Sequence, residues 1–318
     1  MTKKKRKTKK TKKKGKPKFP FILIATLLIA AALAAYMFLS PLSMVGKVLF
    51  QPVKTSSYPN VEKELFGAKR EDVFFKTAGG VKLHGFYFKK PGAKYTFILN
   101  HGQGGNIGAH MGLVKTVLLN NQSVLTYDYE GYGISDGAPS LAGLLEDGKA
   151  AFDFLVQQKG ISPKEIIEYG ASMGTGVAST IALTKGAAAV ILIAPYTSMN
   201  ELAKQKFPYL GLYHDVFFPR PDIGCESFVR YNRSVPVLII HVEKDDTIPL
   251  SHSLELAKLN SRFTRLSVLP ERHHGDFSTE ELALQIGVFL EQELFVPKSE
   301  EVLEVDRKNN AEKTEESK

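Results

Sequence analysis

Residues 166–185 read IIEYGASMGTGVASTIALTK. The first four of these residues are mostly apolar and predict a strand, and the small residues from Met173 onward predict a helix. Between them, Gly170-Ala171-Ser172-Met173-Gly174 has the pattern Gly-x-Ser-x-Gly. Such a serine stands on a sharp turn between a strand and a helix, and its small neighbours allow the backbone to make that turn. The stretch therefore predicts that Ser172 is a nucleophile.

The same pattern occurs a second time, at Gly133-Ile134-Ser135-Asp136-Gly137. So short a pattern arises readily by chance, and its surroundings must decide between the two serines. Ser135 lies in a glycine-rich stretch, and the helical pattern that follows begins only after Pro139-Ser140. This context is typical of a loop, so Ser172 is favoured over Ser135.

On both sides of this stretch, short apolar runs alternate with helical patterns. We expect strands at 73–76, 81–88, 95–99, 123–127, 166–169, 189–193, 237–241 and 266–269, and helices at 107–120, 141–158, 173–185 and 280–294. This alternation predicts an α/β fold with a mostly parallel sheet and helices on both faces. The interval 195–236 interrupts it and is rich in aromatic residues, which predicts a small cap at about 196–235.

A serine nucleophile needs a base, and the base needs an acid that orients it. Glu243-Lys244-Asp245-Asp246 follows the expected strand 237–241, and Arg272-His273-His274-Gly275 follows the expected strand 266–269. The order nucleophile, acid, histidine is the order that this kind of elbow requires. At this point either aspartate and either histidine could serve.

The loop after the expected strand 95–99 reads NHGQGGN over residues 100–106. Its glycines let the backbone approach a substrate closely, and one of its N–H groups could bind an oxyanion together with the Met173 amide. The loop lacks the Gly-Lys-Ser/Thr ending of a P-loop and the spacing of a dinucleotide-binding fingerprint. Cys225 is the only cysteine, so neither an intramolecular disulfide nor a thiolate metal cluster can form.

Together these motifs resemble the alpha/beta-hydrolase superfamily, and within it the membrane-associated esterases and acyl-protein-thioesterase-like proteins. They are also similar to the serine aminopeptidase-like hydrolases. The likeness runs from about Phe50 to Leu294 and includes YDYEGYG over residues 127–133. It implies the alpha/beta-hydrolase fold with no cofactor or metal. The site residues that it implies are the nucleophile Ser172, the acid Asp245, the base His274 and the oxyanion amides of Gln103 and Met173.

The resemblance also chooses between neighbouring candidates. Asp245 is preferred to Asp246 because it stands four residues after His241 and four before Pro249. His274 is preferred to His273 because Gly-Asp-Phe follows it.

Three residues depart from the family pattern. Glu130 stands where Arg is usual, Val242 replaces Gly, and Gln103 replaces a frequent Asn. We therefore expect reversed charge in a loop near the site and a shifted acid loop.

Residues 1–18 contain twelve cations and no acid. Removing these from the 42 basic residues leaves 30 against 33 acidic ones, so the basic charge belongs to this tail. Residues 19–39 carry no charge, and 21 helical residues are long enough for a hydrocarbon core of about 30 Å. The positive-inside rule then predicts a single-pass protein with a cytoplasmic amino terminus and the catalytic domain on the far side of the membrane.

Two alternatives apply to this region. Ala32-Leu33-Ala34 could be the cleavage site of a signal peptide, but the apolar run continues to Leu39, which favours an uncleaved signal-anchor. A lysine-rich tail could bind nucleic acid, but beside an apolar segment it more often sets topology or meets anionic lipid, so no nucleic-acid partner is expected.

The expected organisation is a basic cytoplasmic tail (1–18), a transmembrane anchor (19–39), a connecting segment (40–70), an alpha/beta-hydrolase domain (71–297) and a disordered polar tail (298–318). The expected function is a membrane-anchored serine hydrolase that cleaves carboxylic esters or thioesters of small molecules or lipids. A serine peptidase of the same fold and a catalytically silent, membrane-tethered binding protein are the alternatives.

Overall fold

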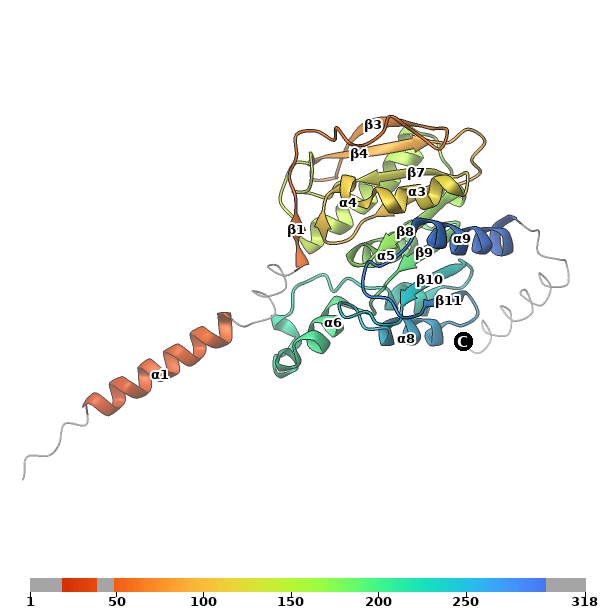
Figure 1. Cartoon of the computed structure of the whole chain (residues 1–318). Coiled ribbons are helices and arrows are strands. Elements are labelled where there is room, and N and C mark those ends of the chain that lie inside the picture. The colour runs from red at the N-terminus through yellow and green to blue at the C-terminus, as the bar shows by residue number, and fades with distance from the viewer. Residues whose placement is uncertain (1–18, 39–48, 296–318) are drawn as a thin grey trace, which may run out of the picture.

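The computed structural model describes residues 19–38 and 49–295 (Figure 1). Helix α1 (Phe19–Phe38) extends away from the rest of the molecule. In this described part of the chain, no helix is both long enough and apolar enough to cross a membrane. The anchor predicted for residues 19–39 is therefore not confirmed. The tails predicted at 1–18 and 298–318 lie outside the described residues.

A nine-stranded sheet forms the centre of the domain, in the order β11-β10-β9-β8-β5-β7-β4-β3-β2. The strands from β7 to β11 pair in parallel, whereas β4, β3 and β2 add an antiparallel edge, so the predicted mostly parallel sheet is confirmed. The strands are β2 (Glu64–Leu65), β3 (Ala68–Lys76), β4 (Lys82–Lys89), β5 (Thr96–Asn100), β7 (Ser123–Tyr127), β8 (Ile166–Ala171), β9 (Ala189–Ile193), β10 (Val237–Val242) and β11 (Thr264–Leu269).

Helices cover both faces of the sheet (Figure 1). On β5, Phe97 and Leu99 enter one core cluster and Ile98 enters the other, as the alternation of side chains along a strand requires. The first cluster includes apolar residues of α3 (Met111–Leu119) and α9 (Thr279–Leu290). The opposite face is covered by α4 (Leu141–Asp153), α5 (Met173–Lys185) and α8 (Ser251–Leu259). The remaining short helices in these layers are η1 (Ile107–His110), η2 (Phe154–Gln158), η3 (Pro163–Glu165) and η6 (Glu291–Phe295).

Two strand registers bring distant loops together. Asn100 at the end of β5 pairs with Gly170 in β8, so the loop after β5 lies beside the turn after β8. Val242 at the end of β10 pairs with Leu269 at the end of β11, so the two loops that follow are also neighbours. Because the carboxyl ends of parallel strands meet at one edge, all four loops lie at the same edge of the sheet.

A small cap lies between β9 and β10. It contains α6 (Met199–Lys206), η4 (Pro208–Leu212) and η5 (Asp215–Phe217), and it is held by its own apolar cluster of Leu210, Tyr213 and Phe218. The Tyr213 ring stacks on Tyr36 of α1 with a centroid separation of 4.4 Å, and its hydroxyl donates to the Tyr36 carbonyl at 2.9 Å. The next helix, α7 (Glu226–Tyr231), packs instead against the helices that cover the sheet.

The segment before β2 is part of the domain from residue 49 onward. Leu49 and Val61 are buried in the domain. The two residues of β1 (Gln51–Pro52) pair in parallel with β6 (Gly104–Gly105), which belongs to the loop after β5. Residues 51–52 of the predicted connecting segment (40–70) therefore lie directly against that loop, and residues 40–48 of that segment lie outside the described residues.

Candidate active site

Ser172 stands at the junction of β8 and α5 with φ +50° and ψ −119°. Few residues other than glycine adopt such a positive φ, and the conformation costs roughly 1–3 kcal/mol. The two glycines of the motif make the turn possible. A Cβ at Gly170 would lie 2.6 Å from the Gly174 carbonyl oxygen, and a Cβ at Gly174 would lie 2.0 Å from the Asn100 carbonyl oxygen. The sequence thus produces the strained turn that was predicted from residues 170–174.

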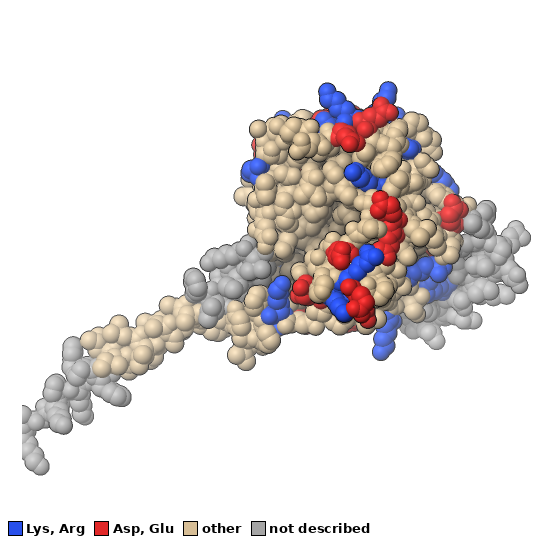
Figure 2. All heavy atoms as spheres, in the orientation of Figure 1, with Lys and Arg blue, Asp and Glu red and all other residues tan. Residues whose placement is uncertain are grey.

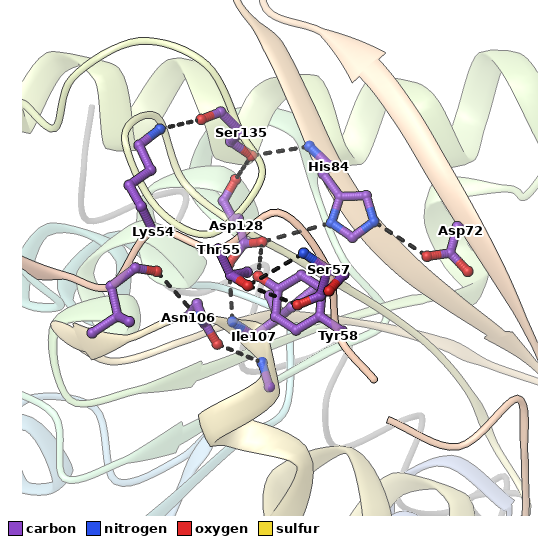
Figure 3. Close-up of polar contacts among 12 residues, drawn as sticks. Lys54, Thr55, Ser57, Tyr58, Asp72, His84, Asn106, Ile107, Asp128 and Ser135 are labelled. Carbon is purple, nitrogen blue, oxygen red and sulfur yellow. Dashed lines mark hydrogen bonds and ion pairs between the residues drawn. The ribbon is translucent and has the colours of Figure 1, made fainter. Parts of the chain in front are cut away.

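Ser135, in the second Gly-x-Ser-x-Gly match, is enclosed. Its side chain is 1% exposed. Its hydroxyl donates to the Asp128 carbonyl at 2.7 Å and accepts from the His84 N–H at 2.9 Å (Figure 3). A hydroxyl buried in this way cannot reach a substrate, so the second match forms a structural turn.

Asp245 and His274 come together at the edge of the sheet. His274 Nδ1 lies 2.7 Å from Asp245 Oδ2, and Asp245 Oδ1 accepts from the amides of Thr247 at 2.9 Å and Ile248 at 2.7 Å. Burial alone would raise the pKa of Asp245, but hydrogen bonds from His241, His274 and the Ile248 amide outweigh it and hold the pKa well below its ordinary value. The carboxylate is therefore ionised at neutral pH and can orient His274.

The neighbouring candidates lie on the surface. His273 and Asp246 are 67% and 73% exposed, and their closest side-chain atoms are 3.9 Å apart. An exposed pair at this distance is screened by water and cannot hold an imidazole in one orientation. Of these two pairs, only Asp245 and His274 lie within hydrogen-bond distance of each other.

The loop after β5 lies against the nucleophile. A Cβ at Gly102 would be 3.7 Å from the Ser172 Cβ, an ordinary contact distance. The buried His101 ring contacts the Gly102 carbonyl through Nδ1 at 2.7 Å. Because a carbonyl can only accept, Nδ1 carries the proton. Since C=O and N–H point in opposite directions across a trans peptide, this bond also directs the Gln103 N–H away from His101.

His101 is a functional candidate that the sequence reasoning missed. Burial, with a smaller contribution from His110, lowers its pKa to about 3, so the ring is neutral and keeps one donor for Gly102. The signal in the sequence was its position between a buried strand and Gly102. Its role depends on contacts that no spacing reveals.

Two cavities meet at Ser172 and Gln103. The first, of about 90 Å³, lies under the cap, and its lining is mostly apolar, including Met199, Leu202, Phe207 and Leu210. The second, of about 430 Å³, has a mixed lining that is more polar than that of the first: Gln51, His110, His274 and Thr279 line it together with apolar residues such as Leu113, Phe277 and Leu282. Some cap aromatics therefore line a cavity, whereas Tyr213 and Phe218 pack in the cap's own core.

Four of the five predicted site residues line one or both of these cavities. Ser172 and Gln103 line both, Met173 lines the first, His274 lines the second, and Asp245 lies behind His274. Within the described residues, no group of three or more His, Cys, Asp and Glu side chains is placed to hold a metal ion.

Two of the three departures from the family pattern, Glu130 and Val242, lie away from the cavities, whereas Gln103 lines both. A Cβ at Gly143, in the first turn of α4, would be 3.0 Å from Glu130 Oε2, so the carboxylate lies at the amino end of that helix. Burial, together with the neighbouring Glu146, raises the pKa of Glu130 above its ordinary value. Val242 is the buried last residue of β10 and extends the strand by one pair. The reversed charge expected near the site therefore faces α4 instead.

Comparison with known proteins supports one family. The family described as "Serine aminopeptidase, S33" matches residues 91–220. YfhR of Escherichia coli (strain K12), itself uncharacterized, is 31% identical over 214 residues, which cover 65% of this chain and 74% of YfhR. Alpha/beta hydrolase domain-containing protein 17B of Xenopus laevis is 37% identical over 170 residues, which cover 52% of this chain and 55% of that protein.

Solved structures share the fold at low sequence identity. The Pyrococcus furiosus esterase Pf2001 matches with a TM-score of 0.63 and 20% identity, over 77% of this chain and 98% of that one. Est1E from Butyrivibrio proteoclasticus matches with a TM-score of 0.57 and 18% identity, over 71% of this chain and 99% of that one. The fold, the loops at the sheet edge and these relatives together show that the chain belongs to the serine aminopeptidase S33 family of alpha/beta hydrolases.

Proposed function

We propose that this protein is a serine hydrolase of carboxylic esters or thioesters, with Ser172 as its nucleophile. The observation that carries the proposal is the position of Ser172. It stands on a strained turn where two cavities meet, with His274 lining one of them and Asp245 hydrogen-bonded to His274. Strain at a non-glycine residue in such a place is typical of a functional site.

The reaction proceeds in two steps. His274 takes the Ser172 proton as the hydroxyl attacks the carbonyl carbon, and the amides of Gln103 and Met173 donate to the oxyanion. His274 then gives the proton to the leaving alcohol or thiol as its bond to the carbonyl carbon breaks. In the second step His274 deprotonates water, which attacks the carbonyl carbon of the acyl-serine ester. The bond from that carbon to Ser172 Oγ then breaks, His274 returns the proton to Oγ, and the acid is released. Asp245 keeps Nδ1 protonated, so that Nε2 can act as the base.

The two cavities suggest how a substrate lies. Since His274 must protonate the leaving group, that group belongs on the His274 side, in the larger and more polar cavity. The acyl group then occupies the narrow apolar cavity under the cap. The preferred substrate is therefore an ester or thioester with an apolar acyl chain and a larger, more polar alcohol or thiol.

Labelling by a fluorophosphonate probe tests the nucleophile. The full chain is compared with Ser172→Ala, Ser135→Ala and His274→Ala, and folding is checked by circular dichroism. We expect labelling to be lost with Ser172→Ala, retained with Ser135→Ala and strongly reduced with His274→Ala. A folded wild-type chain that neither labels nor cleaves p-nitrophenyl esters would refute the proposal and favour a silent binding protein.

A peptidase activity is the second candidate, and the description of the family favours it. An aminopeptidase has to accommodate the cationic amino terminus of a peptide, for which a carboxylate is the natural partner. Among the described residues that line the two cavities there is no Asp or Glu. We therefore expect p-nitrophenyl acyl esters to be cleaved far faster than aminoacyl p-nitroanilides, and the reverse order would establish the peptidase.

We also propose that residues 1–39 attach the protein to a membrane as an uncleaved anchor, with the domain on the non-cytoplasmic side. The support is the sequence: twelve cations precede 21 residues without charge. Charged groups of both signs are interspersed on the face of the domain in Figure 2, whereas α1 is uncharged. Retention of the chain in membranes at high pH and protection of the domain from added protease would support this, and release into the soluble fraction would contradict it.

A further inference from the structure

We propose that residues 51–58, called the strap below, hold the oxyanion loop (102–105) in its working geometry. The strap is thus a positioning element for catalysis. This inference rests on the proposed function, because it assigns the strap's effect to the Gln103 amide.

The strap forms backbone hydrogen bonds with the oxyanion loop. The Gln51 N–H donates to the Gln103 carbonyl at 3.2 Å, and the Val53 N–H donates to the Gly105 carbonyl at 2.8 Å. Tyr132 also donates to the Gln103 carbonyl, at 2.8 Å, and His110 Nε2 contacts the Gly104 carbonyl at 2.9 Å. Three successive carbonyls of the loop are therefore bonded, two of them to the strap.

The other edge of the strap is bonded to the glycine-rich loop that contains Ser135. The Val53 carbonyl accepts from the Gly133 N–H at 3.2 Å and from Asn106 Nδ2 at 3.1 Å. The Thr55 N–H donates to the Gly133 carbonyl at 3.2 Å, and Lys54 Nζ donates to the Ser135 carbonyl at 2.6 Å (Figure 3). The strap therefore lies between two loops and is bonded to both.

The far end of the strap is fixed in the core. Tyr58 donates its hydroxyl proton to the buried carboxylate of Asp128, whose other oxygen accepts from the Ile107 N–H at 2.9 Å (Figure 3). The Tyr58 ring also stacks against His84, with centroids 5.6 Å apart. Ile107 lies two residues after the end of the oxyanion loop. Asp128 therefore connects the end of the strap, at Tyr58, to the backbone that follows the loop, at Ile107. The second Gly-x-Ser-x-Gly match, residues 133–137, thus forms the loop that bonds to the strap on the side away from the oxyanion loop.

These contacts explain how a loop rich in glycine can present a fixed donor. Gly102, Gly104 and Gly105 have few conformational preferences of their own, so the loop needs external bonds to keep one geometry. Oxyanion stabilisation depends on donors that are already oriented, and loss of one donor typically lowers kcat about 10²–10³-fold. A loosened loop keeps its donor but misplaces it for part of the time, so we expect a loss of at least about tenfold.

The test compares Val53→Pro with Val53→Ala in the full chain. Proline removes the N–H that bonds to Gly105, whereas alanine keeps it. The Val53 side chain is 55% exposed, so neither replacement removes a buried apolar contact. We expect Val53→Pro to lower kcat for a p-nitrophenyl ester and the rate of fluorophosphonate labelling at least about tenfold, with KM within about twofold. We expect Val53→Ala to stay within about twofold of wild type in both measurements.

A second variant removes a hydrogen bond to the carbonyl of Val53 in place of the bond from its N–H. Asn106→Asp keeps the oxygen that accepts from the Gly108 N–H but loses the Nδ2 donor to the Val53 carbonyl. Asn106→Asp should also lower kcat while leaving KM within about twofold of wild type. If Val53→Pro does not fold, Asn106→Asp alone tests whether the strap positions the oxyanion loop.

The outcomes separate the two proposals. Folded Val53→Pro and Asn106→Asp variants with the kcat of Val53→Ala, in an active wild-type background, overturn the strap's role alone. A change in KM without a change in kcat also overturns it, because the strap would then act on binding. A folded wild-type chain without activity overturns the proposed function and the strap's role together.

Discussion

Replacing Asp245 by Asn tests the site at a single atom. Asn keeps Oδ1, so the amides of Thr247 and Ile248 can hold the side chain in its present orientation. The NH₂ group then occupies the position of Oδ2, 2.7 Å from His274 Nδ1. Two donors cannot face each other, so Nδ1 must become the acceptor and the proton must move to Nε2. Nε2 is the atom that has to receive the Ser172 proton.

The expected loss follows from that change of tautomer. We expect kcat to fall by about 10³–10⁴-fold, or roughly 4–5.5 kcal/mol of transition-state stabilisation at about 1.36 kcal/mol for each factor of ten. The fold should be kept because both backbone bonds to Oδ1 remain, but the contact from His241 to Oδ2 is lost, so some loss of stability is expected. Steady-state hydrolysis of a p-nitrophenyl ester and the second-order rate of fluorophosphonate labelling measure the loss. Thermal denaturation measures the stability.

Asp246→Asn is the matched control, since it removes the same charge one residue away. Its side chain is 73% exposed, and we expect its activity to stay within about twofold of wild type. Asp245→Asn with more than about a tenth of wild-type activity would refute this reasoning. Equal losses in the two variants would refute it too, because the effect would then come from the charge of the loop and not from the tautomer of His274.

Three further predictions concern stability. The φ of +50° at Ser172 favours glycine, so inactive Ser172→Gly should be about 1 kcal/mol more stable than inactive Ser172→Ala, and equal melting temperatures would argue against strain at this turn. Gly174→Ala would place its Cβ 2.0 Å from the Asn100 carbonyl oxygen, and it should lower the free energy of unfolding measured in urea by about 3 kcal/mol or more. The control Gly211→Ala, whose Cβ would have no neighbour within 4 Å, should change that free energy by less than about 0.5 kcal/mol, and similar values for the two variants would contradict the clash. Burial raises the pKa of Glu168 from 4.5 to about 8, so between these pH values the folded state binds more protons than the unfolded state, and the free energy of unfolding should fall as the pH rises. Glu168→Gln should reduce the difference between the unfolding free energies measured in urea at pH 5 and at pH 8, and an unchanged difference would contradict a protonated Glu168.

Local patterns predicted much of the sheet edge. Apolar runs such as 189–193 coincide with a strand because strands buried on both faces are continuously apolar. The turn at Ser172 was predictable because a strand, two glycines and a helix follow one another within a few residues. The loops that hold Asp245 and His274 were predictable because each follows a strand, although the choice between neighbouring residues depended on a family resemblance.

Features that depend on distant parts of the chain were not predictable. The strands at 51–52 and 104–105 have two residues each, which is too short for any periodicity, and they exist only because they pair with each other. Helix α8 (Ser251–Leu259) was not expected, because its sequence is largely polar with a narrow apolar face. The role of His101 depends on its burial, and the two cavities depend on how the cap folds back over the sheet.

The parallel pairing of Gln51–Pro52 with Gly104–Gly105 determines where the chain can be cut when the domain is produced alone. Continuous strand patterns begin near residue 71, which makes that position an inviting start for a recombinant fragment. Such a fragment would lack Tyr58 and both strap amides that bond to the loop, and it would expose the carboxylate of Asp128. Its failure to cleave an ester would reflect the cloning boundary, so expression should start no later than Leu49.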